Sequence, residues 1–420
     1  MKLRLALPAG LFDTGSASLG TFIVQAYAVR SLDADALGVY AVFFSAYLFA
    51  SQATQFLLLY PLEIAVLQLP RASRIQLLRR SARLASIGPI AAVVGVIAAI
   101  LITGSAAEGL ALGFSLTMAA VAATSPLYEH TKRMLHLSDR SWHAAGLAQM
   151  QLVALILILG TMIVVDTPVH WVPFGALAGS HVIALLMAAI TIRGGEIDSL
   201  STPLGSLIRS GRWLLISGMM PPLATLIAAG LIARLAGVEQ LGFAQAAHVA
   251  SRPILILASG LSAVLGYRLM EAGSTRTKSA GNRYWRLYTT ILVIGGGAYV
   301  LLTGFDWVGN PMAALLPRAY EVGGLVLVAL GANIVAALMR PVRNELIGAH
   351  WEPRVATVDT VAAAGLLTVA AFSGSLDAFA VPLGILAGAL VHVVGYLPAR
   401  QAMYQTPSRV SDRAPPSGLT

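Results

Sequence analysis

The 420-residue sequence contains no cysteine, and only 11% of its residues are charged. The absence of cysteine excludes disulfides, thiol catalysis and cysteine-based metal sites. A nucleotide-binding loop is also missing, because the nearest match, residues 273–279, lacks the glycine before the lysine and follows a hydrophobic segment instead of a strand. No loop is long enough to hold a soluble catalytic domain. We therefore expect no ATP hydrolysis, no enzymatic activity and no cofactor.

Long apolar runs dominate what is present. The hydrocarbon core of a bilayer is about 30 Å thick, so each helical crossing needs roughly 20 apolar residues. Twelve such runs predict an all-α, polytopic membrane protein. The predicted spans are 8–29, 37–60, 84–104, 109–128, 143–165, 170–192, 207–233, 238–267, 284–304, 319–340, 355–374 and 377–397.

Positive charge alternates between successive loops. With residue 1 in the cytoplasm, the inner segments hold 24 of the 28 Lys and Arg residues, the outer loops hold three, and Arg252 lies inside a span. This asymmetry obeys the positive-inside rule only if the number of spans is even. We therefore predict a multi-pass protein of the cell (cytoplasmic) membrane with both termini in the cytoplasm.

The net charge of +9 has the same origin. Basic cytoplasmic loops meet anionic lipid headgroups, so membrane lipid, and not nucleic acid, is the expected partner. The apolar start of the chain is too long and too polar for a signal-peptide core and is predicted to be the first membrane helix. Residues 403–420 are polar and rich in Pro and Ser, which predicts a disordered cytoplasmic tail.

The chain repeats itself. Arg30 and Leu37-Gly38 recur 204 residues later as Arg234 and Leu241-Gly242, each time at the link between two spans. A second match relates Pro126 to Pro341. Each half carries six spans, so both insert in the same orientation, which predicts two parallel six-helix lobes around a central cavity. The predicted lobes are 1–200 and 201–402.

Arg252 is the most unusual residue of the sequence. An arginine well inside a span costs several kcal/mol on insertion scales, roughly +2.5 to +3.5, unless it faces water or a partner. Gln245, His248, Arg252 and Ser259 share one helix face by spacing. One interpretation is that they line a cavity in which Arg252 binds an anionic group. The other is that Arg252 forms a structural ion pair, or caps backbone carbonyls, between helices.

Polar stripes also mark the first two spans. Such stripes line a hydrophilic space in some transporters and serve only helix–helix hydrogen bonding in others. Three stripes together favour a shared cavity. Those of the first two spans are Thr14, Ser18, Thr21 and Gln25, and then Ser45, Gln52 and Gln55.

Three acids lie within or beside spans, namely Asp13, Glu63 and Asp359. Intramembrane carboxylates serve as proton or sodium sites, and those close to the membrane surface also reach headgroups or loop arginines. Asp13 and Asp359 are the candidates for binding a coupling H⁺ or Na⁺. Because no nucleotide site is expected, uphill transport would depend on such an ion or on downstream consumption of the product.

The segment from Val29 to Ala41, with its Leu-Gly-x-Tyr-Ala turn, resembles the N-terminal signature of polysaccharide-type flippases. These belong to the multidrug/oligosaccharidyl-lipid/polysaccharide (MOP) superfamily. The segment from Ala233 to Ala244 is similar to the second-lobe copy of that signature. The resemblance implies two lobes around a cationic cavity, and transfer of a polyprenyl-diphosphate-linked oligosaccharide from the inner to the outer leaflet for cell-surface polysaccharide biosynthesis. It also implies that Arg252 holds the diphosphate, that the protein is a monomer, and that polysaccharide-assembly enzymes are candidate partners.

Other functions stay open at this point. A cation-coupled multidrug or small-solute exporter of the same superfamily has the same plan. A major-facilitator carrier also has parallel six-span halves, but the loop after its second span carries a Gly-x-x-x-Asp-Arg motif that residues 70–83 lack. A scaffold of an envelope-assembly complex is the non-transport alternative. If the fold is the flippase one, spans one, two, seven and eight should meet at the cavity.

Overall fold

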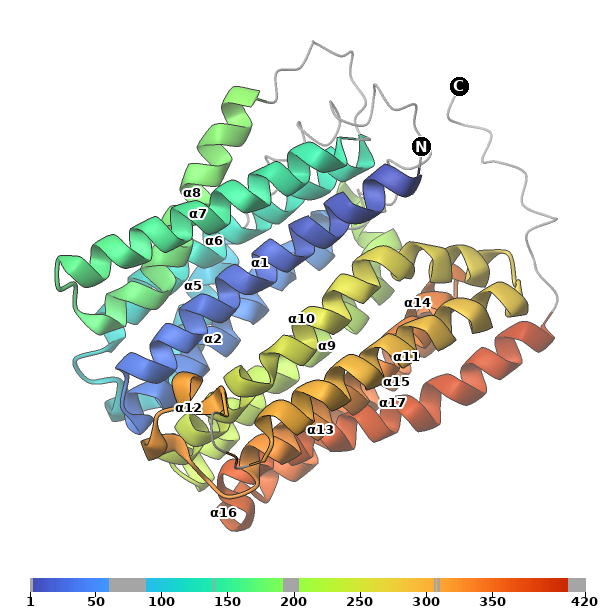
Figure 1. The fold of residues 1–420 in the computed structure, drawn as a ribbon. Helices are drawn as coiled ribbons and strands as arrows, with labels where there is room; N and C mark the ends of the chain where they lie inside the picture. The colour runs from blue at the N-terminus through green and yellow to red at the C-terminus, as the bar shows by residue number, and fades with distance from the viewer. Residues whose placement is uncertain are drawn as a thin grey trace.

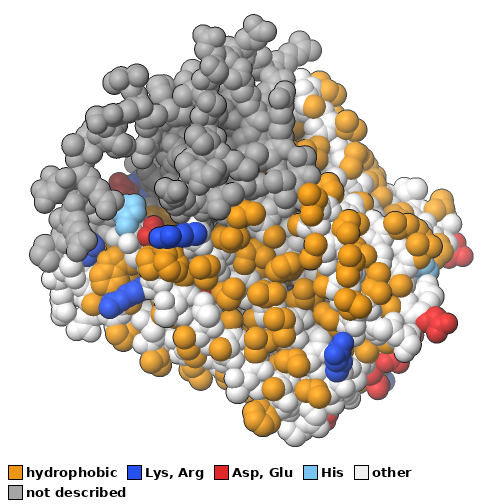
Figure 2. All heavy atoms as spheres, turned by 180° about the vertical axis from the view of Figure 1, so that it is seen from behind, with side chains coloured by type: hydrophobic (Ala, Val, Ile, Leu, Met, Phe, Trp, Pro, Cys, Tyr) orange, Lys and Arg blue, Asp and Glu red, His pale blue; other side chains and the backbone are white. Residues whose placement is uncertain are grey.

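The computed structural model is almost wholly helical over the residues it describes, which are 3–59, 88–138, 140–191, 204–305, 307 and 310–406. Hydrophobic side chains cover much of the described surface seen in Figure 2. Eleven helices of the described part are long and apolar enough to cross a membrane. The first helix, α1 (Leu3–Ser31), is not among these eleven, because the polar residues of its stripe lower its hydropathy. Glu63 and the basic segment 71–83 lie outside the described residues.

The other N-terminal helices are α2 (Ala34–Thr54), continued by a π-helix over Gln55–Leu59, α5 (Gly88–Thr103), α6 (Ala111–Leu137), α7 (Ser141–Val164) and α8 (Val172–Thr191). The C-terminal helices are α9 (Leu204–Leu235), α10 (Val238–Ser274), α11 (Lys278–Thr303), α13 (Leu325–Leu338) with α14 (Arg340–Gly348), α15 (Glu352–Ala371) and α17 (Ala380–Gln405). Each predicted span therefore has its helix.

Several helix ends differ from the predicted ones, and three of them matter here. α6 continues to Leu137, nine residues past the predicted end of its span, because Pro126 is tolerated inside the helix. α13 begins only at Leu325, after the left-handed Gly324 (φ 77°). α17 continues through residues 403–405, the start of the predicted tail, while 407–420 lie outside the described residues. The predicted lobe boundary at 200/201 also lies outside them and stays a prediction.

The helices form two six-helix lobes, the first from α1 to α8 and the second from α9 to α17 (Figure 1). The start of α1 and the end of α17 lie at one end of the molecule, hereafter the terminal end; the opposite end is the far end. The lobes meet mainly through α1 and α2 on one side and α9 and α10 on the other. These are spans one, two, seven and eight, as the sequence predicts for this fold.

Apolar packing differs between the two ends. Around the far-end links, residues of both lobes share one hydrophobic core, which includes Leu37 and Leu241. Toward the terminal end, separate apolar clusters lie within each lobe, one around Tyr128 and another around Tyr396. Among the described residues, the shared apolar core therefore joins the lobes at the far end, while these two clusters of the terminal end each stay within one lobe.

Candidate functional site: the cavity between the lobes

A cavity of about 810 Å³ lies between the lobes on the terminal side. α1 and α6 form its N-lobe wall, and α10 and α11 form its C-lobe wall. Its lining contains three basic residues, two acids and a histidine. These are Lys132, Arg133, Arg268, Asp13, Glu129 and His136.

Part of the predicted polar stripes lines this cavity. Thr14 and Ser18 of α1 do so, and Ser259 of α10 faces them from the other lobe. The Ser259 hydroxyl also accepts a hydrogen bond from Arg340 at 3.1 Å. Thr21 lies further along α1 and donates to the Ala17 carbonyl at 2.9 Å, so in this conformation its hydroxyl serves its own helix.

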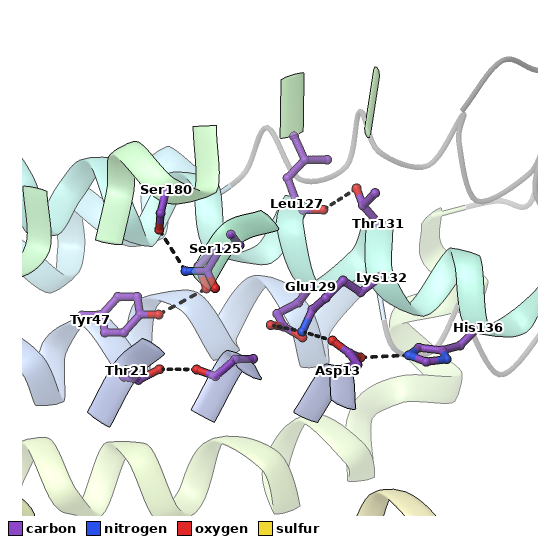
Figure 3. Close-up of polar contacts among 12 residues, drawn as sticks. Asp13, Thr21, Tyr47, Ser125, Leu127, Glu129, Thr131, Lys132, His136 and Ser180 are labelled. Carbon is purple, nitrogen blue, oxygen red and sulfur yellow. Dashed lines mark hydrogen bonds and ion pairs between the residues drawn. The ribbon is translucent and has the colours of Figure 1, made fainter. Parts of the chain in front are cut away.

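Asp13 is the centre of a charged cluster in the N-lobe (Figure 3). One carboxylate oxygen lies 3.0 Å from the Lys132 ammonium, and the other lies 2.8 Å from the His136 ring. The same ammonium lies 3.0 Å from Glu129. Because both Asp13 oxygens already have protein partners, a metal cation would have to displace one of them.

The sequence predicts that the helix of the fourth span continues inward from Pro126 through Lys132, but it does not indicate Lys132 as a site residue. The structure confirms the continuation, because α6 runs to Leu137, and it shows the Lys132 side chain only 5% exposed. Glu129, Lys132 and His136 follow each other at i, i+3 and i+7 and so share one helix face. This spacing is the signal in the sequence that points to the cluster.

Arg252 lies beyond this cavity, where the lobes are in contact. Its guanidinium donates a hydrogen bond to Gln25 Oε1 across the lobes and lies 5.8 Å from the centre of the Phe44 ring. No carboxylate pairs with it among the described residues. Arg252 is therefore a charge held by a neutral amide and an aromatic ring, about two turns along α10 from Ser259 of the cavity lining.

The remaining stripe residues lie near the lobe contact. Gln245 and His248 are half-buried on α10, and Gln52 and Gln55 are half-buried at the end of α2. The side-chain nitrogens of Gln25, Gln245 and Gln55 are buried without a hydrogen-bond partner among the described residues. An unpaired buried amide costs roughly 1–3 kcal/mol, so these groups are available to a polar ligand when the lobes separate.

Asp359, the second candidate ion site, lies inside the C-lobe and not in the cavity lining. Its carboxylate accepts hydrogen bonds from Ser217 at 2.6 Å and from Tyr396. It also lies 3.3 Å from Arg343 and 3.2 Å from His392. A second buried pair, Arg400 and Glu345, ties α17 to α14 nearby at 2.5 Å.

Solved structures of very different sequence share this architecture. An inward-facing multidrug resistance MATE family transporter of the MOP superfamily matches with a TM-score of 0.67 at 15% identity, over 96% of this chain and 99% of its own. The fold is that of the MOP superfamily. An outward-facing multidrug resistance MATE transporter matches with a TM-score of 0.64, also at 15% identity, over 97% and 98% of the two chains.

A MOP transporter from Pyrococcus furiosus, described as having a binding pocket of reverse polarity that suggests a different function, matches with a TM-score of 0.69 at 15% identity over 97% of both chains. No family model and no curated protein sequence matches the chain. At these identities the likeness concerns the fold, which rules out the major-facilitator plan and leaves the substrate to be argued from the site.

Proposed function

We propose that this protein is a membrane transporter that flips a polyprenyl-diphosphate-linked oligosaccharide from the inner to the outer leaflet by alternating access. One observation carries the proposal: basic side chains of both lobes, Lys132 and Arg133 from α6 and Arg268 from α10, line one cavity. Guanidinium and ammonium groups are the side chains that bind phosphate best. A diphosphate between them would contact both lobes at once.

The size of the cavity supports a large polar headgroup. Pockets for small ligands run from about 300 to 1,000 Å³, and 810 Å³ is near the top of that range. Arg252 is a further cationic group in line with it, beyond the cavity. We propose that it receives the diphosphate once the lobes part and Gln25 is released.

A cation-coupled multidrug exporter is the second candidate. The MATE neighbours are described as multidrug resistance transporters, and Asp13 and Glu129 in the cavity lining could attract a cationic drug. Both acids, however, lie 3.0 Å from the Lys132 ammonium, so a cationic drug would compete with this lysine for them. Coupling of transport to H⁺ or Na⁺ bound at Asp13 or Asp359 is part of the proposal. In each case the ion would compete with the basic side chain that is already paired with the aspartate.

The deciding experiment compares two probes on the purified protein in nanodiscs. A polyprenyl diphosphate bearing a fluorescent monosaccharide tests the flippase, and ethidium tests the exporter. We expect the diphosphate to bind and Lys132→Met to weaken its binding at least about tenfold, which corresponds to the loss of one buried charge contact. The control Arg354→Met removes an exposed arginine outside the cavity. Binding of ethidium alone would overturn the flippase in favour of the exporter.

Membrane orientation is tested separately, because the chain has no cysteine of its own. Single cysteines replace exposed Ala106, at the far end, and exposed Thr277, at the terminal end. With both termini cytoplasmic, an impermeant thiol reagent labels position 106 in intact cells, and position 277 only after permeabilisation. The opposite pattern would contradict this orientation.

A further inference from the structure

The two Leu-Gly motifs of the sequence meet each other in space. Gly38 lies in the first turn of α2 and Gly242 in the first turn of α10, and these turns come from opposite lobes. A Cβ atom on Gly38 would lie 2.0 Å from the carbonyl oxygen of Val238. A Cβ atom on Gly242 would lie 2.0 Å from the carbonyl oxygen of Ala34. Both contacts are with backbone, which cannot rotate away.

The contact is reciprocal. Val238 and Ala34 are the first residues of α10 and α2, and they are related by the same repeat as the two glycines. Each lobe therefore places its glycine on the first peptide of the other lobe's helix. Only a residue without a side chain permits so close an approach of two backbones.

A strap from the C-lobe covers the same place. The segment between α11 and α13 carries Tyr320, which is only 4% exposed. The Tyr320 hydroxyl donates to the Leu32 carbonyl at the end of α1 at 2.6 Å, while its ring lies edge-on to Phe243, 6.0 Å between centres. Burial, with the negative charge of Asp33, raises the pKa of Tyr320 to about 12, so the hydroxyl remains a donor at physiological pH.

We infer that Gly38 and Gly242, with Tyr320 across them, form the seal that closes the transport cavity at the far end. The seal joins the lobes only in the conformation described here, because in each contact the partner belongs to the other lobe. A side chain at either glycine therefore opposes this closed state and leaves the interior of each lobe unchanged. The population shifts toward the conformation that is open at the far end.

The test uses cysteine accessibility in nanodiscs, where both faces are in contact with reagent and no substrate is needed. Ala246→Cys reports on the sealed region, because Ala246 is fully buried one turn below Gly242 on the same helix face. Ala263→Cys reports on the terminal cavity, which it lines. We expect Gly38→Ala and Gly242→Ala to raise the maleimide reactivity of position 246, by about tenfold or more in the double variant, and to lower that of position 263.

Two glycines serve as matched controls. Gly331→Ala meets no atom within 4 Å and should change nothing. Gly273→Ala meets the Glu345 carbonyl oxygen at 2.0 Å, but within the C-lobe, so it should lower the yield of folded protein without exposing position 246. Well-folded Gly38→Ala and Gly242→Ala variants with position 246 still unreactive would overturn the inference.

If neither glycine variant folds, the variant Tyr320→Phe tests the seal instead. It removes one interlobe hydrogen bond outside the helices, so it should raise the reactivity of position 246 a few-fold; an unchanged rate would overturn the seal. The inference rests on the proposed alternating access but not on its substrate. If the glycine variants expose position 246 as expected but the diphosphate probe does not bind, the flippase proposal is refuted and the inference about the seal stands.

Discussion

The two lobes each hold a buried aspartate between a strong base and a histidine, but in different surroundings. In the N-lobe, Asp13 lies between Lys132 and His136 at the edge of the cavity. In the C-lobe, Asp359 lies between Arg343 and His392, with its side chain 2% exposed and closed in by helices of that lobe alone. The two clusters thus contain the same kinds of side chain, but only the N-lobe cluster lines the cavity. We expect the first cluster to act in transport and the second to stabilise its lobe.

The largest effect is expected from Lys132→Met. It leaves Asp13 and Glu129 without their shared cation, and breaking a buried ion pair costs about 3–5 kcal/mol. We expect no measurable flipping of the fluorescent diphosphate lipid in liposomes, and a low yield of folded protein.

The double variant Asp13→Asn/Lys132→Met, which removes one charge of each sign, separates these two losses. It should restore most of the folded yield, because the buried Asp13 charge is removed together with Lys132 and the remaining acid, Glu129, is 34% exposed, but it should not restore the binding of the diphosphate probe. Wild-type binding by the double variant would make the N-lobe cluster structural, like that of the C-lobe.

Arg252→Ala tests the charge that belongs to neither cluster. Removing a charge from inside a span relieves an insertion cost, so the protein should still accumulate while transport is lost. Lysine should restore only part of the activity, because it cannot bind two phosphate oxygens as a fork. Normal transport by the alanine variant, measured per folded molecule, would refute a role for Arg252 in transport.

Asp359→Asn should affect stability more than transport. The asparagine keeps the shape of the side chain but removes the charge opposite Arg343, at a cost of about 3 kcal/mol. We expect a lower midpoint of thermal unfolding in detergent, with transport per folded molecule within about twofold of wild type. Asp13→Asn should instead affect transport more than stability. Lost transport in a stable Asp359→Asn protein would instead place a coupling ion in the C-lobe.

The smallest effect concerns the two histidines. His136 lies 2.8 Å from Asp13 in the cavity lining, whereas His392 lies 3.2 Å from Asp359 inside the C-lobe. His136→Gln should therefore weaken binding of the diphosphate probe about two- to threefold, the size of one lost hydrogen bond, and His392→Gln should leave it unchanged. Weaker binding in His392→Gln alone would reverse the assignment.

How far the sequence alone reaches is clear from particular residues. The length of the apolar runs and the alternation of charge predict the helices, because the bilayer imposes one solution on every span. The repeat of Leu37-Gly38 as Leu241-Gly242 predicts two parallel lobes. The depth of Arg252 follows from counting along one helix. These properties are local or periodic, and a single segment determines each of them.

Only the tertiary structure determines which polar side chains contact one another. Asp13 and Lys132 are over a hundred residues apart, and only the packing of α1 against the N-lobe brings them together. Spacing along α10 places Ser259 and Arg252 on one face, but only the closure of the lobes puts Ser259 in the cavity and Arg252 against Gln25. A sequence specifies which side of a helix is polar. It does not specify which polar group of another helix contacts that side, because the distance between the two groups is set only when the helices pack.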